Sequence, residues 1–170
     1  IMFPSTLTTG VRQKKPPVYQ KARQLPQVLL TVPGARSVSR MAQKIILVVA
    51  AALIDVDGRV LLAQRPAGKS MAGLWEFPGG KVAAGETPEA ALVRELREEL
   101  SIDVQPKCLA PFTFASHAYA DFHLLMPLYV CRNWEGEVEP REGQRIQWVR
   151  AQRLGDYEMP PADVPLVTML

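Results

Sequence analysis

The 170-residue chain has only two cysteines, Cys108 and Cys131, and neither lies in a CxxC or Cys/His pattern. Two thiols are too few for a disulfide framework, and their surroundings give no zinc site. We expect both to be reduced and mostly buried. Long hydrophobic runs are also missing, because the longest, residues 45–54, has ten residues and a membrane-spanning helix needs about 18. The sequence therefore predicts a soluble protein without a membrane partner.

Acidic residues are missing from the first 40 residues, which contain seven Lys or Arg and five prolines. Subtracting this +7 from the net charge of +3 leaves −4 for the other 130 residues. The positive charge thus belongs to this segment and says nothing about a substrate of the remainder. Few aromatics and no sustained period predict a disordered basic tail over residues 1–40. One ordinary domain is expected over residues 41–170.

Three interpretations of the tail compete: an organelle presequence, a nucleic-acid-binding arm, or upstream sequence that is not part of the working protein. The chain opens with Ile1, and Met41 stands just before the first strand-like run. This favours the third interpretation, in which translation starts at Met41 and the protein is cytoplasmic. The alternative is an organelle-targeted protein, if residues 1–40 are a genuine presequence.

The remaining residues alternate between strand-like and helix-like runs. The apolar, β-branched run 45–54 predicts a buried strand. Asp57-Gly58 then predicts a hairpin turn that pairs this run with residues 59–64. Further strands are expected at residues 102–104, 112–115, 123–131 and 145–149, with a last helix after Pro161. The mixed order predicts an α/β sandwich with a mixed, partly antiparallel sheet.

A helix is predicted over residues 88–100, with Thr87 as its N-cap. At roughly 100° per residue, Glu95, Glu98 and Glu99 share one face of this helix, and aliphatic residues occupy the other. Like charges at this spacing repel by a few tenths of a kcal/mol per pair, and a hard divalent cation relieves such repulsion. An isolated E-x-x-E-E is more often a solvated helix face, so the surrounding residues decide between the two.

The spacing around these glutamates is specific. Gly80, Glu86 and Arg94 precede them as Gly, five residues, Glu, seven residues, Arg-Glu-x-x-Glu-Glu. With each identity at about 7%, chance agreement is on the order of one in ten million per start position. The pattern resembles the Nudix box, G-x5-E-x7-R-E-U-x-E-E-x-G-U, where U is a bulky aliphatic. Ser101 replaces the last glycine, so we expect about 1 kcal/mol of strain or a different helix end there.

The resemblance implies a Nudix α/β/α sandwich with a metal site for Mg²⁺, for which Mn²⁺ can substitute. In this family Glu95, Glu98 and Glu99 would bind the metal. The backbone carbonyl of Gly79 or Gly80 would complete the site. A metal held in this way implies a substrate that carries phosphates.

Other residues would act around that metal. Arg94 would orient the glutamates. Glu86 would bond to the segment around Gly79 and Gly80, here called the glycine loop, and support it. Lys81 would reach a phosphate, unless it is merely a solvated lysine. Glu142, on a later loop, would approach the metal and act as general base, and Glu95 is the competing assignment. The resemblance thus gives Glu95, Glu142 and Arg94 as the catalytic residues, with Glu142 also near the metal.

Beyond the box, the chain is similar to the MutT branch of the family. The likeness rests on residues 74–81, 134–136, 141–144 and 159–165. It places Arg65, Phe77 and Asp163 around the nucleotide base, where an aromatic face can stack and a carboxylate can accept hydrogen bonds. Asp163 leaves the base undecided, because MutT proteins often have Asn there and relatives acting on cytidine nucleotides look alike. Asp163 could instead cap the last helix, and Phe77 could simply be core.

The MutT likeness implies a monomer or homodimer that hydrolyses nucleoside triphosphates. Water would attack the β-phosphorus and give a nucleoside monophosphate and pyrophosphate. Oxidised substrates such as 8-oxo-dGTP would link this activity to mutation avoidance during DNA replication and repair. Cytidine triphosphates, sugar nucleotides or dinucleoside polyphosphates are alternative substrates, and a nucleotide-binding regulator without turnover is a further alternative. The charge of −4 argues against nucleic-acid binding by the folded domain.

Overall fold

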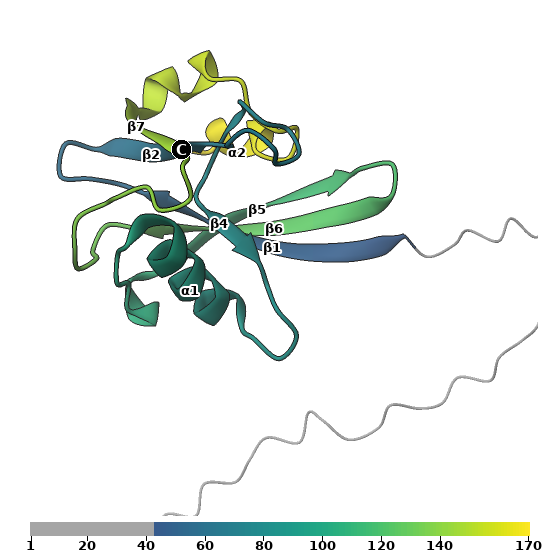
Figure 1. The fold of residues 1–170 in the computed structure, drawn as a ribbon, viewed down its shortest axis with the longest axis horizontal. Helices are drawn as coiled ribbons and strands as arrows, with labels where there is room; N and C mark the ends of the chain where they lie inside the picture. The colour runs from purple at the N-terminus through teal and green to yellow at the C-terminus, as the bar shows by residue number, and fades with distance from the viewer. Residues whose placement is uncertain (1–42) are drawn as a thin grey trace, which may run out of the picture. The chain divides into compact units, whose positions relative to one another are not determined.

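The computed structural model describes residues 43–170, in which two β-sheets and two α-helices pack together (Figure 1). The four-stranded sheet has the order β4-β1-β6-β5 and contains β1 (Lys44–Leu53), β4 (Gly79–Lys81), β5 (Ala110–Ala118) and β6 (Phe122–Cys131). The three-stranded sheet has the order β3-β2-β7 and contains β2 (Arg59–Gln64), β3 (Trp75–Glu76) and β7 (Arg145–Arg150). The helices are α1 (Pro88–Leu100) and α2 (Val164–Val167), with the 3-10 helices η1 (Pro106–Cys108) and η2 (Ala151–Asp156). The predicted tail over residues 1–40, its three interpretations and the start at Met41 lie outside the described residues.

The larger sheet is mixed, as the sequence predicts. Strand β1 pairs parallel with β6 and antiparallel with β4, and β5 pairs antiparallel with β6. Helix α1 lies on one face of this sheet, and the three-stranded sheet and α2 lie on the other (Figure 1). The prediction of an α/β sandwich with a mixed, partly antiparallel sheet is confirmed, and the structure shows that the strands divide between two sheets.

The predicted hairpin pairing of β1 with β2 is wrong. The turn between them forms, and the backbone N–H of Arg59 donates to the carboxylate of Asp55 at 2.8 Å. A single isolated bridge, Ile54 with Val60, then joins the two segments before β2 enters the other sheet. Strands β4 and β6 occupy the two edges of β1, so β2 finds its partners in β3 and β7 instead.

Two smaller predictions also change. Residues 102–104 form no strand, because the backbone of Asp103 only makes an isolated bridge with Glu135. Ile102 and Val104 are buried beside α1, which explains their apolar character. The last helix is present but is a single turn, α2. The other expected strands lie within β5, β6 and β7.

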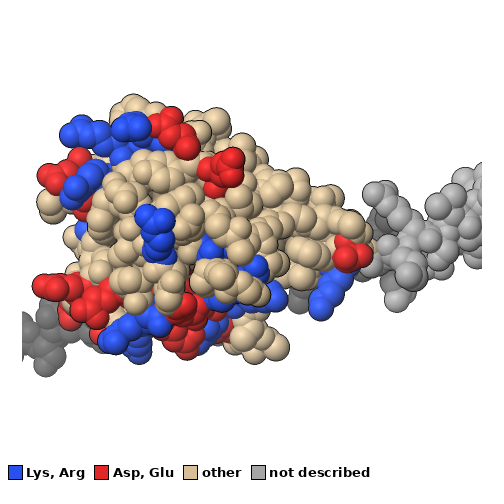
Figure 2. All heavy atoms as spheres, turned by 45° about the horizontal axis from the view of Figure 1, so that its top comes forward, with Lys and Arg blue, Asp and Glu red and all other residues tan. Residues whose placement is uncertain are grey.

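The surface and the thiols of the described residues agree with the composition. Cys131 is buried and Cys108 is half-buried, and both are free thiols. None of the helices within residues 43–170 combines the length and the hydrophobicity that crossing a membrane requires. On the face in Figure 2, Lys and Arg side chains lie beside Asp and Glu side chains.

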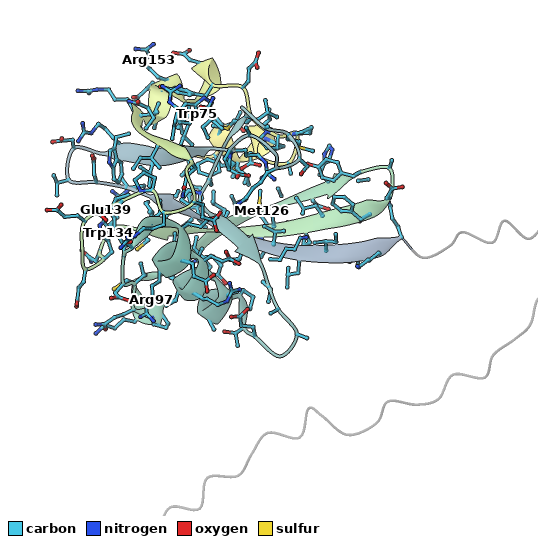
Figure 3. All side chains as sticks on the ribbon, viewed as in Figure 1. Trp75, Arg97, Met126, Trp134, Glu139 and Arg153 are labelled. Atoms are coloured by element: carbon cyan, nitrogen blue, oxygen red, sulfur yellow. The ribbon has the colours of Figure 1, made fainter. Side chains whose placement is uncertain are left out.

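Helix α1 begins and ends as its sequence predicts. The hydroxyl of Thr87 accepts the backbone N–H of Ala90 at 3.2 Å. Ser101 lies in the left-handed region (φ 59°, ψ 24°), and its N–H donates to the carbonyl of Arg97 at 3.1 Å. Ser101 therefore ends the helix in the conformation that glycine adopts more easily. The side chain of Arg97 points away from the sheets, on the outer side of α1 (Figure 3).

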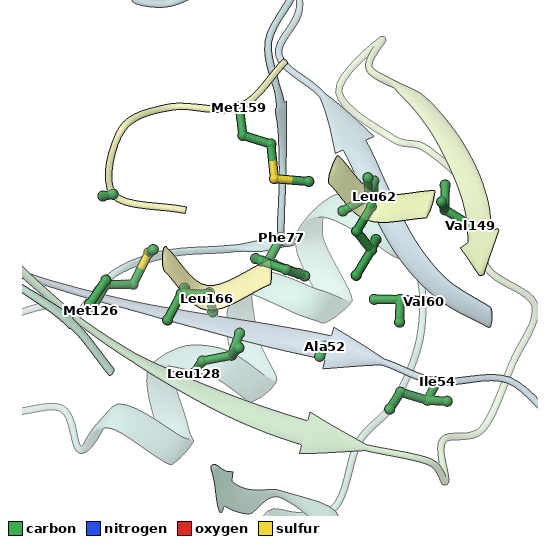
Figure 4. Packing of buried hydrophobic residues seen from close by; sticks show 14 of the residues in the cluster. Ala52, Ile54, Val60, Leu62, Phe77, Met126, Leu128, Val149, Met159 and Leu166 are labelled. Carbon is green, nitrogen blue, oxygen red and sulfur yellow. The ribbon is translucent and has the colours of Figure 1, made fainter. Parts of the chain in front are cut away.

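The second half of β1, residues 49–53, is buried on both faces, because alternate residues enter two different clusters. The first half of the predicted buried run is more open, and Ile45 is exposed. Val49 and Ala51 pack in the cluster that α1 covers with its leucines. Ala52 faces the opposite cluster, where Phe77 and Leu166 lie close to it between β1 and α2 (Figure 4). Strand β1 thus fixes α1 on one side and the segment containing Phe77 on the other.

We predict that Thr87→Ala lowers the free energy of unfolding by about 1 kcal/mol, because it removes the N-cap hydrogen bond of α1. Thr87→Ser keeps the hydroxyl and is the matched control. Urea unfolding followed by circular dichroism measures both variants. Equal stability of Thr87→Ala and Thr87→Ser would show that the cap contributes nothing.

Candidate active site

A pocket of about 550 Å³ lies beside β4 and α1. Carboxylates and glycines line one part of it, namely Glu95, Glu99, Glu142, Gly79 and Gly80. Aromatic and buried polar residues line another part, among them Phe77, Tyr119, Phe122 and Asp163. Segments far apart in the sequence thus contribute to one cavity that joins an acidic region to a region suited to an aromatic ring.

Arg94 is the positive centre of the acidic region. Its guanidinium donates to the carboxylates of Glu86, Glu95 and Glu98 at 2.9, 2.8 and 3.2 Å. Arg94 therefore contacts three of the glutamates, and its predicted role of orienting them stays a prediction. One guanidinium carries a single positive charge, so the three carboxylates together keep an excess of negative charge.

Glu99 lies on the pocket side of α1, in the same pocket as Lys69. Its carboxylate accepts the backbone N–H of Gly79 at 3.3 Å. Burial, together with the negative charges of Glu142 and Glu95, raises the pKa of Glu99 to about 7. A site that disfavours ionisation of an acid in this way is one that a bound cation would stabilise.

The glycine loop fits closely against Glu95. A Cβ atom at Gly80 would lie 2.2 Å from the carboxyl carbon of Glu95, and one at Gly79 would lie 2.1 Å from the carbonyl oxygen of Val49. A side chain at Gly79 would therefore collide with the backbone of β1, and one at Gly80 would displace the carboxylate of Glu95. Glu86 holds the loop from the other side, where it accepts the N–H of Ala83 at 3.1 Å.

The donor chemistry of this region fits a hard divalent cation. Its groups are carboxylate oxygens and backbone carbonyls, which are the ligands that Mg²⁺ and Mn²⁺ prefer. Within residues 43–170, however, no three His, Cys, Asp or Glu side chains lie close enough together to hold a metal. Arg94 instead holds Glu95 and Glu98. The structure thus brings the predicted ligands to one face of α1, and their metal-binding role stays a prediction.

Glu142 reaches the pocket from the loop before β7, where its carboxylate forms an ion pair with Lys69. The hydrogen bond to Glu142 raises the pKa of Lys69. Sequence reasoning missed Lys69, because it lies in a loop between β2 and β3 without a recognisable pattern. The only feature of the sequence that could have indicated its role is its positive charge beside Gly68. Lys81, directly after the glycines, is exposed and also lines the pocket.

Asp163 is the buried acid of the other region. It is 5% exposed, and its carboxylate accepts the backbone N–H of Phe77 at 3.3 Å. Burial, with a smaller contribution from the negative charge of Glu76, raises its pKa to about 7. Asp163 occupies the N-cap position of α2, as the alternative predicted, but its side chain makes no capping hydrogen bond to that helix.

Phe77 and Arg65 line the same pocket as Asp163, and both already make contacts within the protein. Phe77 is 3% exposed and belongs to the core cluster, so the alternative of a core residue holds for its ring. Arg65 forms an ion pair with Glu76 and donates to the carbonyl of Ser70 at 2.6 Å. Burial raises the pKa of Glu76 despite this pair. Their predicted contacts with a nucleotide base stay predictions.

Two aromatic residues at this end were missed by the sequence reasoning. Tyr119 and Phe122 line the pocket, and their rings stack with centroids 4.8 Å apart. They come from the end of β5 and the start of β6, which meet across the turn at residues 119–122. In the sequence, the only indication of their role is that they precede the strand predicted over residues 123–131.

Comparisons with known proteins agree with this geometry. Residues 49–169 match the family model of the NUDIX domain. The CTP pyrophosphohydrolase of Escherichia coli K12 is 40% identical over 121 residues, which cover 70% of this chain and 87% of that protein. The 8-oxo-dGTP diphosphatase of the same strain is 36% identical over 114 residues, covering 67% of this chain and 87% of that protein.

Solved structures give the same result. The E. coli ORF135 protein superposes with a TM-score of 0.65 at 38% identity, covering 75% of this chain and 89% of that chain. A structure reported in a study of MutT from Aliivibrio salmonicida and Vibrio cholerae superposes with a TM-score of 0.63 at 36% identity, covering 74% and 95%. The chain therefore belongs to the Nudix family of hydrolases, which generally use a divalent metal. Within that family it is MutT-like.

We predict that Asp163→Asn is more stable than the unaltered protein at about pH 8, by a few kcal/mol at most. The folded state keeps Asp163 protonated up to about pH 7, whereas an unfolded Asp ionises near about pH 4. Between these values the folded state binds more protons, so its stability falls as pH rises. Asn cannot ionise, yet it still offers an acceptor to the N–H of Phe77.

Urea unfolding at several pH values measures this difference. The gain in stability from Asp163→Asn should shrink as pH falls and vanish near about pH 4. Asp121→Asn, at an exposed turn residue, is the matched control and should show no such trend. A gain from Asp163→Asn that is independent of pH would contradict the raised pKa.

Proposed function

We propose that the protein hydrolyses nucleoside triphosphates, including oxidised ones such as 8-oxo-dGTP, to a nucleoside monophosphate and pyrophosphate. The observation that carries this proposal is that one pocket is lined both by Glu95 and Glu99 of α1 and by the buried Asp163. A nucleotide has the same two parts, a charged polyphosphate and an aromatic base. Relatives at 36–40% identity are named 8-oxo-dGTP diphosphatase, which supports the proposal.

Mg²⁺ is the metal that we propose, with Mn²⁺ as a substitute. Glu95, Glu98 and Glu99 would hold it with a backbone carbonyl of Gly79 or Gly80. Such an ion neutralises the polyphosphate charge and lowers the pKa of a coordinated water molecule. Rotation of Glu95 and Glu98 away from Arg94 would free their oxygens for this role, and Arg94 would keep its contact with Glu86.

The other side chains would position the reacting groups. A water oxygen would attack the β-phosphorus, and the bond from that phosphorus to the oxygen bridging to the α-phosphate would break. The monophosphate leaves with that oxygen, and the water proton passes to Glu142 or Glu95. Lys69 and Lys81, which both line the pocket, would place positive charge beside the phosphates.

Cytidine triphosphate is the second candidate substrate. The relative at 40% identity is named CTP pyrophosphohydrolase, and the recognition residue is Asp163. With a pKa of about 7, this acid is protonated in part of the molecules at neutral pH. It can then donate one hydrogen bond as well as accept others, and both guanine-like and cytosine edges offer partners for such a group.

The wider role follows from the substrate. Hydrolysis of oxidised triphosphates would keep them out of DNA replication, which is a role in mutation avoidance in the cytoplasm. The mixed charges on the face in Figure 2 do not form the basic stripe typical of a nucleic-acid-binding surface. The free nucleotide is accordingly the proposed substrate.

A pyrophosphate-release screen over canonical and 8-oxo nucleoside triphosphates, with and without Mg²⁺, tests the proposal. We expect Mg²⁺-dependent release with a clear preference for 8-oxo-dGTP over dGTP. A preference for cytidine nucleotides would support the second candidate. Failure to hydrolyse every nucleotide in the screen would refute both.

Matched variants test the residues in the same screen. Glu98→Gln and Glu99→Gln keep the size of the side chain and remove its charge, so turnover should fall by about 100-fold or more while the circular dichroism spectrum stays unchanged. Glu137→Gln, at an exposed position outside the pocket, is the control and should retain full activity. Activity near that of the unaltered protein in both α1 variants would rule out their role as ligands.

A further inference from the structure

The loop that carries Glu142 is hydrogen-bonded to the C-terminal end of α1. The backbone N–H of Glu139 donates to the carbonyl of Leu100 at 3.0 Å, and that of Arg141 donates to the carbonyl of Glu99 at 2.9 Å. A helix end leaves such carbonyls without partners inside the helix, and this loop supplies them. The loop position is therefore set by the same helix that presents the glutamates.

Gln144 adds a side-chain bridge within this arrangement. It is a polar residue that is only 8% exposed. Its Oε1 accepts the backbone N–H of Glu142 at 2.7 Å, and its Nε2 donates to the carbonyl of Glu99 at 2.9 Å. A glutamine amide offers an acceptor and a donor at one end of the side chain. One buried amide thus ties together the backbones of two residues whose carboxylates line the pocket.

The carboxylate of Glu142 has a second restraint that is weaker. Its ion pair with Lys69 joins two side chains that are 40% and 49% exposed. Water screens such a pair, so it contributes little to holding one geometry. The buried bridge beneath the backbone of Glu142 is the firmer restraint of the two.

We propose that Gln144 is a positioning residue, which fixes the backbone under Glu142 so that its carboxylate faces Glu99 across the pocket. The consequence for turnover rests on the proposed function, because it requires that Glu142 act in hydrolysis. The bridge itself does not depend on that function. Partners of this kind, which orient groups around a metal, typically change activity by about 10–100-fold when removed.

Gln144→Met tests the proposal, because methionine is similar in length but makes neither hydrogen bond. We expect kcat to fall about 10–100-fold, with KM changed by less than about three-fold. Gln147→Met is the matched control, since Gln147 is exposed on β7 and its amide donates to the carbonyl of Trp148 at 3.4 Å. It should leave both constants unchanged.

A second pair of variants separates positioning from a general effect on the fold. In the Glu142→Gln background, Gln144→Met should lower the remaining kcat by less than about three-fold, because the carboxylate that it positions is already gone. An equal fold-change in both backgrounds would overturn the proposal. So would a kcat of Gln144→Met equal to that of the unaltered protein.

Amide hydrogen exchange measured by NMR gives a readout without substrate. In the unaltered protein the Glu142 amide should be protected, and in Gln144→Met its exchange should accelerate by about ten-fold or more, but not in Gln147→Met. Exchange of the Glu142 amide at the rate of a free chain in the unaltered protein would overturn the proposal, even if Gln144→Met failed to fold. If the unaltered protein hydrolyses no nucleotide, the proposed function fails, and amide exchange still decides whether the bridge exists.

Discussion

Repulsion among carboxylates that share one arginine governs the site. Arg94 donates to Glu86, Glu95 and Glu98, while Glu99 lies half-buried on the same helix with its pKa raised to about 7. The leucines of α1 on the opposite face are buried and hold the helix in place, so the glutamates cannot separate by moving the helix. A divalent cation at this face would relieve the repulsion, and the same ion would bind the phosphates of a nucleotide.

The fold brings the rest of the pocket to that face. The second half of strand β1 is buried on both sides, so it places α1 in one cluster and the segment with Phe77 in the other. Between them, Gly79 lies close to the backbone of Val49 and Gly80 lies close to the carboxylate of Glu95, because neither glycine has a Cβ atom. The loop before β7 then bonds to the end of α1. A short set of backbone contacts thus brings the acidic region and Asp163 into one pocket.

Local patterns predicted the local features well. The limits of α1 and its Thr87 cap follow from residues adjacent in sequence, and the mixed sheet is inferred from the order of strand-like and helix-like runs. The left-handed end at Ser101 is one of the two outcomes that the sequence left open. The pairing of β1 with β2 could not be predicted, because the choice between two sheets depends on β4 and β6, which come later in the chain. Lys69 and Gln144 were missed because their partners lie 73 and 45 residues away along the chain. Tyr119 stacks on Phe122 nearby, and it was missed because aromatic residues are common in ordinary strands and turns.

Binding of Mn²⁺ to the unaltered protein without nucleotide tests the central claim most directly. In ¹H–¹⁵N spectra recorded during a titration, the paramagnetic ion broadens the amide signals nearest to it. We expect the signals of Gly79, Gly80 and Glu99 to broaden first, while those of Asp103 and Arg153, at exposed positions outside the pocket, persist. Broadening that begins elsewhere, or that affects all signals equally, would contradict a metal site on this face of α1.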